Sequence, residues 1–167
     1  LGSPIQYVWV FDDDPGEEAI DDLRRAIARG ALHRAVVRTR VPAARHRWVR
    51  STFDPPTEVA AEIDEDAVGS WADERVRAAR LRPADGTGWR IESALTPSGR
   101  RVMSLTISHM ISDGHGIYRA LAAAAEGSDV ALPDPVRPND RRVLREDLAD
   151  AAGQLRAAVR SSRILLR

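Results

Sequence analysis

The residue types best suited to catalysis gather in one short stretch, positions 108–116. His109 can serve as a general base, because an imidazole readily takes a proton from a hydroxyl or an amine near neutral pH. Asp113 supplies a carboxylate four residues later, and Gly114 and Gly116 allow the backbone to turn tightly. The same pattern also fits a structural interpretation, in which His109 closes a strand and Asp113 only caps a helix.

A strand and a helix are predicted on either side of this stretch. The apolar run at 101–107 predicts the strand, and the alanine-rich run at 117–125 predicts the helix. Since side chains alternate along a strand, His109 continues the more apolar row, which includes Ile107. We expect the imidazole to be partly desolvated there, which lowers its pKa and favours the neutral form that a base requires.

The order His109-x-x-x-Asp113-Gly114, between an apolar strand and an alanine-rich helix, resembles the HxxxDG signature of the CoA-dependent acyltransferase superfamily. This superfamily includes chloramphenicol acetyltransferase, nonribosomal peptide condensation domains, polyketide-associated acyltransferases and the bacterial wax ester synthase/diacylglycerol acyltransferases. The last group is the most similar, because the order of the elements ahead of the motif also matches, up to the arm with Gly88-Trp89-Arg90. The likeness covers roughly residues 4–160.

The resemblance implies roles for individual residues. His109 would be the catalytic base, Asp113 would be structural and paired with an arginine, and Gly114 would permit the tight turn. Ser108 stands where many members have a first histidine, which is a departure from the pattern. Ser108 and Ser112 are the nearby hydroxyls that could bind substrate, although each also fits an ordinary strand or loop residue.

The resemblance also implies the reaction and the partners. An acyl group would move from a CoA or carrier-protein thioester, which is a co-substrate, to a hydroxyl or an amine in lipid metabolism, with no further cofactor. Members of the superfamily have two similar lobes around an active-site channel and are more than twice as long. We therefore expect an N-terminal lobe at 1–140, and a C-terminal helix with an apolar tail at 141–167 that leads toward a second lobe. That lobe, or a second copy of the chain, is the expected protein partner.

Two other functions stay open. An incomplete lobe would fold and act as a binding or oligomerisation module without turnover, because catalysis by proximity needs both walls of a channel. Alternatively, His109, Asp113 and His115 are acceptable metal ligands, as in a metal-binding hydrolase. Against a metal site, no fourth ligand is evident nearby and His109 and His115 belong to different predicted elements.

Composition excludes several classes of protein. The 167 residues are 43% hydrophobic, enough for one core, and the 25 acidic residues balance 25 basic ones, all arginine, so nothing suggests binding to nucleic acid. The absence of Cys excludes disulfides, zinc–thiolate sites and cysteine nucleophiles. No run is apolar enough to span a membrane and no signal peptide is visible, so we expect a cytoplasmic protein.

The remaining pattern predicts alternating strands and helices, with an irregular segment at 53–65. Strands are predicted at 5–11, 33–41 and 47–51, a hairpin at 89–96 and 101–109, and helices at 14–30, 67–81 and 141–160. This order predicts an α/β fold, more closely an α+β two-layer sandwich, with a mixed sheet and helices on one face. The resemblance implies the same for a single lobe of the chloramphenicol acetyltransferase-like fold.

Overall fold

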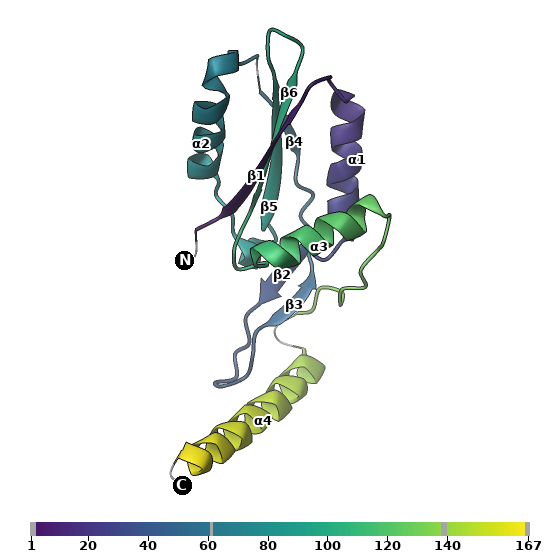
Figure 1. The fold of residues 1–167 in the computed structure, drawn as a ribbon. Helices are drawn as coiled ribbons and strands as arrows, with labels where there is room; N and C mark the ends of the chain where they lie inside the picture. The colour runs from purple at the N-terminus through teal and green to yellow at the C-terminus, as the bar shows by residue number, and fades with distance from the viewer. Residues whose placement is uncertain (1–2, 61, 138–139, 166–167) are drawn as a thin grey trace.

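The protein is built around a four-stranded sheet, shown almost edge-on in Figure 1. The computed structural model describes residues 3–60, 62–137 and 140–165. The strands lie in the order β1 (Ile5–Phe11), β6 (Arg101–Ile107), β5 (Trp89–Leu95) and β4 (Thr57–Val59). The first three are antiparallel neighbours, whereas β4 runs parallel to β5, so the sheet is mixed as the sequence predicts.

The helices cover both faces of this sheet (Figure 1). Helices α1 (Gly16–Arg29) and α3 (Gly114–Ala125) lie on one face and α2 (Val68–Ala78) on the other. The α/β class and the single-lobe architecture are confirmed, but the expectation of helices on one face holds only for α1 and α3. The reason is that Trp71 of α2 buries itself beside Val102, on the opposite side of β6 from the main core.

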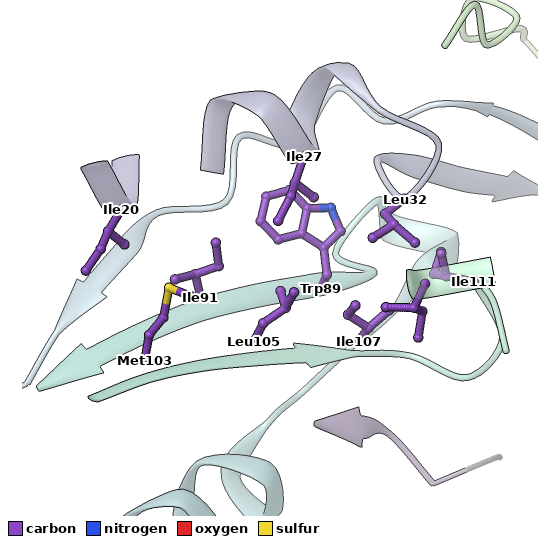
Figure 2. Packing of buried hydrophobic residues seen from close by; sticks show 10 residues of the cluster. Ile20, Ile27, Leu32, Trp89, Ile91, Met103, Leu105, Ile107 and Ile111 are labelled. Atoms are coloured by element: carbon purple, nitrogen blue, oxygen red, sulfur yellow. The ribbon is translucent and has the colours of Figure 1, made fainter. Parts of the chain in front are cut away.

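The main core lies between the sheet and the helices α1 and α3. Figure 2 shows the side chains of Ile91, Leu105 and Ile107 directed toward the helix that carries Ile20 and Ile27. Burial of each such aliphatic side chain contributes about 1.5–3 kcal/mol to stability. The other members of this cluster are Leu32, Trp89, Met103, Ile111 and Ile117. The strand that leads to His109 is therefore buried along its whole length.

A separate pair of strands, β2 (Arg34–Val37) and β3 (Arg47–Arg50), forms a small antiparallel sheet beside the core. Helix α4 (Arg141–Leu165) attaches to it and extends away from the larger sheet (Figure 1). Asp147, on α4, is buried against β3, where its carboxylate accepts two hydrogen bonds from Arg47. Two short 3-10 turns, η1 (Glu65–Ala67) and η2 (Pro83–Asp85), complete the described elements. None of the described helices combines the length and the apolar character that a membrane span needs.

The predicted elements agree with the structure except at their ends and at β4. Strand β1 and the hairpin of β5 and β6 lie where the sequence predicts them, and α3 begins three residues earlier than predicted, at Gly114. Strand β4 lies inside the segment predicted to be irregular, because three residues are too short to show an alternating pattern. The expected apolar tail includes residues 164–166, and their side chains lie outside the described part of the chain.

Candidate functional site

The site residues lie in the loop between β6 and α3. Strand β6 ends at Ile107, and the last ladder-like contact is the hydrogen bond from the Ser108 amide to the Gly88 carbonyl, at 2.8 Å. The amide of Ile111 then bonds back to the Ser108 carbonyl, which turns the chain. The alternation of the strand therefore stops before His109, which is exposed. The expectation of a partly desolvated imidazole is wrong for this reason.

One hydrogen bond holds the His109 ring. Its Nδ1 lies 3.1 Å from the main-chain carbonyl oxygen of Ser112. Since a carbonyl oxygen can only accept, Nδ1 must be the protonated nitrogen in the neutral ring. The other nitrogen, Nε2, then carries the free lone pair and can accept a proton. The loop thus fixes both the direction of the ring and its tautomer.

Asp113 caps helix α3. Its Oδ1 accepts a hydrogen bond of 2.7 Å from the Gly116 amide, and its carbonyl accepts the first intrahelical bond, from Ile117. The side chain is exposed, and within residues 3–60, 62–137 and 140–165 no arginine forms an ion pair with it. The pairing that the resemblance implies is therefore not present in this structure, and the cap orients the carboxylate instead.

The arginine that contacts the loop is Arg34, at the start of β2. Its Nη2 donates to the main-chain carbonyl of Ile111, and its guanidinium lies 4.6 Å from the ring centroid of Trp48. Burial lowers the pKa of Arg34, and within the described part of the chain no carboxylate neutralises this side chain. The half-buried guanidinium of Arg34 thus contacts both the Trp48 ring and the Ile111 carbonyl. These two contacts hold the loop against β2 and β3.

Space for a side chain is much tighter at Gly116 than at Gly114. A β-carbon on Gly116 would lie 2.1 Å from Oγ of Ser112, whereas one on Gly114 would meet only the Tyr7 hydroxyl, at 4.0 Å. Neither glycine has a positive φ. Close packing, and not an unusual backbone angle, therefore explains the glycine in this loop. The resemblance implies the turn role for Gly114, whereas the close contact lies at Gly116.

The two candidate serines differ in their surroundings. Ser108 is buried, its Oγ accepts a hydrogen bond of 3.3 Å from the Met110 amide, and it lines a pocket of about 470 Å³. Ser112 is half-buried and contributes its carbonyl to His109. His109 itself does not line the pocket, although both of its chain neighbours do. The pocket is a feature that the sequence did not reveal.

The structure does not assemble the alternative metal site. His109, Asp113 and His115 are all exposed, and His115 lies in the first turn of α3. Among the residues described, no group of three or more His, Asp or Glu side chains is arranged to hold a metal ion. The geometry at this loop instead suits proton transfer by a single imidazole.

Comparison with known proteins identifies the fold. No protein-family profile and no curated protein sequence matches the chain, but solved structures do. The condensation domain that mediates chain release from the enacyloxin polyketide synthase is 18% identical, with a TM-score of 0.58 over 92% of this chain. The starter condensation domain of the rhizomide synthetase RzmA is 16% identical, with a TM-score of 0.58 over 91% of this chain. The SgcC5 protein from Streptomyces globisporus is 24% identical, with a TM-score of 0.56 over 80% of this chain.

The chain corresponds to only part of these proteins. It spans 32%, 38% and 33% of the three matched chains, in the order given. It therefore has the fold of a single condensation-domain lobe. The fold that the sequence-based resemblance implies, a single lobe of this type, is confirmed.

Proposed function

We propose that this chain is the lobe of an acyltransferase that carries the catalytic base, and that His109 is that base. The reaction would move an acyl group from a CoA or carrier-protein thioester to a hydroxyl or an amine. The observation that carries the proposal is the hydrogen bond from His109 Nδ1 to the Ser112 carbonyl, because it leaves Nε2 unprotonated and open to a substrate.

In the proposed reaction, Nε2 of His109 takes the proton of the acceptor hydroxyl or amine as that group attacks the thioester carbonyl. The carbon–sulfur bond then breaks, and the thiolate that leaves receives the proton from the imidazolium. The proton on Nδ1 stays with the Ser112 carbonyl throughout, so that carbonyl orients the ring and stabilises its charged form. The HxxxDG interpretation of the loop thus assigns the chemistry to His109, and the support of the loop to Asp113 and Gly114.

The acyl chain and the acceptor follow from the resemblance to the wax ester synthase/diacylglycerol acyltransferases. We propose a long-chain acyl-CoA as donor and a long-chain alcohol as acceptor, with a role in lipid metabolism in the cytoplasm. The alternative to a long-chain alcohol is a peptide-type acceptor, as for condensation domains. The pocket beside Ser108 and Met110 has apolar walls, which favours an aliphatic substrate over a peptide.

The test is an acyl-transfer assay with palmitoyl-CoA and either hexadecanol or hexadecylamine as the acceptor. Because the chain contains no Cys, a thiol reagent can follow the release of CoA without background from the protein. Replacement of the base, His109→Ala, is expected to lower the rate about a hundredfold or more. The matched control is His115→Ala, another exposed histidine nearby, which should retain the full rate. Equal rates in His109→Ala and the unmodified protein would remove the base assignment.

A second candidate function is a lobe that becomes active only against another protein surface. The observation that favours it is the exposure of His109, since a base open to bulk water lacks the second wall that a channel provides. The candidate partner is a second lobe or a second copy of the chain. If a second copy completes the site, the rate per molecule should rise with protein concentration in step with dimer formation seen by sedimentation. A rate per molecule that stays constant while the dimer forms would reject this candidate.

A further inference from the structure

A pocket of about 470 Å³ lies beside the loop that carries His109. It falls in the size range of small-molecule sites, about 300–1,000 Å³. Its walls come from segments far apart in the chain, among them β2, the segment that follows α2, the η2 turn and the start of the His109 loop. Seven of its lining residues are apolar, namely Pro4, Val36, Ala79, Leu81, Pro83, Ala84 and Met110.

The other lining residues are polar, and three of the four are basic. Arg38, Arg82 and His46 line the pocket together with Ser108, and none of the described residues that line it is acidic. Arg38 and His46 have no ion pair within the described part of the chain, and Arg82 has only a 3.8 Å contact to Asp85. Two arginines beside apolar walls, one without an ion pair among the described residues and one only weakly paired, are complementary to a negative charge.

We infer that this pocket binds an apolar chain that carries an anionic group, with the chain against Val36, Leu81 and Met110 and the anion held by Arg38 and Arg82. The anion can be a carboxylate or a phosphate, because the arginine fork binds both through paired hydrogen bonds. His46 adds a third hydrogen-bond donor. The assignment of this ligand as a substrate rests on the proposed acyl transfer, whereas the binding of the ligand does not.

The location of the pocket connects it to the loop. Ser108 and Met110, the neighbours of His109 on each side, both line it, so a bound chain would lie next to the backbone of the proposed base. Met110 is 49% exposed, and a flexible thioether at this point adapts to chains of different shape. A ligand in the pocket would therefore reduce the exposure of Met110.

The binding test uses the full chain and a matched set of octyl probes, measured by isothermal titration calorimetry. Octanoate and octyl phosphate present the two anions, octanol presents the chain alone, and acetate and inorganic phosphate present the charge alone. We expect both amphiphilic anions to bind, octanol to bind about tenfold more weakly, and the small ions to show no binding. The tighter of the two anions distinguishes a fatty carboxylate from a phosphate-bearing donor. If octanol binds as tightly as octanoate, or if no octyl probe binds, the inference is wrong.

Variants separate the role of the arginines from general effects of charge. The double variant Arg38→Met with Arg82→Met should bind octanoate about tenfold more weakly. Both side chains are exposed, so thermal unfolding should be unchanged. The control Arg40→Met removes an exposed arginine that does not line the pocket and should bind normally. Unchanged octanoate binding in the double variant would overturn the assignment.

His109→Ala distinguishes this inference from the proposed function. It should bind octanoate as the unmodified protein does while it loses acyl transfer. Normal binding together with a lack of transfer in the unmodified protein would reject the transferase and keep the pocket. Transfer that depends on His109, without any binding of octanoate or octyl phosphate, would reject the pocket and keep the transferase.

Discussion

Gly116 faces the hydroxyl of Ser112 so closely that a β-carbon on Gly116 would lie 2.1 Å from that oxygen. The same β-carbon would lie 3.2 Å from the Asp113 carboxylate that caps α3. The carbonyl of Ser112 is also the group that holds the His109 ring. The first turn of α3 therefore packs directly on the loop that orients the proposed base, and a change at Gly116 acts on that base through Ser112.

Alanine at the two glycines of this loop should have opposite effects. Gly114→Ala is expected to stabilise the protein by about 0.5–1 kcal/mol, because alanine reduces the freedom of the unfolded chain and there is space for its methyl group. Gly116→Ala should not be stabilised in this way and should have a lower transfer rate, because its methyl group displaces the Ser112 hydroxyl. Urea unfolding and the acyl-transfer assay measure the two effects. Adding Ser112→Ala to Gly116→Ala should restore both, and a double variant as impaired as the single one would contradict the packing argument.

Arg34 should stabilise the loop through its bond to the Ile111 carbonyl. Arg34→Met removes the donor and the contact with Trp48, and the expected cost in unfolding free energy is about 1–3 kcal/mol. Arg34→Lys should recover only part of this, because an ammonium group lacks the planar face that stacks on an indole. Arg40→Met is the control, as Arg40 is exposed and makes no hydrogen bond or ion pair within the described residues. A variant Arg34→Met as stable as this control would contradict the role of Arg34.

The attachment of α4 should weaken in acid. Hydrogen bonds from the Arg45 side chain and amide lower the pKa of Asp150, on α4, to about 2 from its ordinary value of 3.8. A carboxylate with a depressed pKa stabilises the folded state fully above pH 3.8, and this contribution is lost as the pH falls from there toward 2. NMR titration of the Asp150 carboxyl should show the low midpoint, and Arg45→Gln should raise it. A midpoint near 3.8 in the unmodified protein would show that the pair does not form in solution.

Glu92 should destabilise the protein at neutral pH. Its side chain is 2% exposed, and burial raises its pKa even though Arg90 and Arg75 approach Oε1 at 2.8 and 3.4 Å. Its Oε2 is buried without a hydrogen-bond partner. A carboxyl with a raised pKa binds more protons when folded, so stability falls as the pH rises above 4.5 through the folded pKa.

Glu92→Gln tests this account, because an amide of the same shape carries no charge. At pH 7.5 the variant should be at least as stable as the unmodified protein in urea, and the loss of stability between pH 5 and 7.5 should become smaller. Arg90 keeps its ion pair with Glu58, and Arg75 keeps its ion pair with Glu74, so neither arginine is left without a partner. A large loss of stability at pH 7.5 would show that the arginines outweigh burial.

The sequence predicted the elements around the site better than the position of the base within them. The hydrophobic pattern identified β6 and α3 because long apolar runs determine burial directly. The same pattern wrongly extended the alternation of strand side chains to His109. It contains no sign that the strand pairing ends at the hydrogen bond between Ser108 and Gly88. The exposure of the imidazole follows from that bond and could not be read from residue types.

The support of the loop was not predictable for a related reason. Arg34 acts on a main-chain carbonyl, which is present at every residue, so no pattern of side chains marks its partner among 25 basic residues. Likewise, β4 pairs in parallel with β5 through only three residues, and such a short edge strand has no period to detect. Patterns along the sequence predict helices and strands, whereas contacts between distant segments are seen only in the structure.

The pairing of β1 with β6 has a consequence for how the protein is made. Each residue of β1 meets its partner only after 90 to 102 further residues have left the ribosome, from Phe11 opposite Arg101 to Ile5 opposite Ile107. Until then, an apolar strand with free amides and carbonyls is available to other nascent chains. Chaperone binding during synthesis should therefore concentrate on residues 5–11, and slow translation before position 101 should increase aggregation.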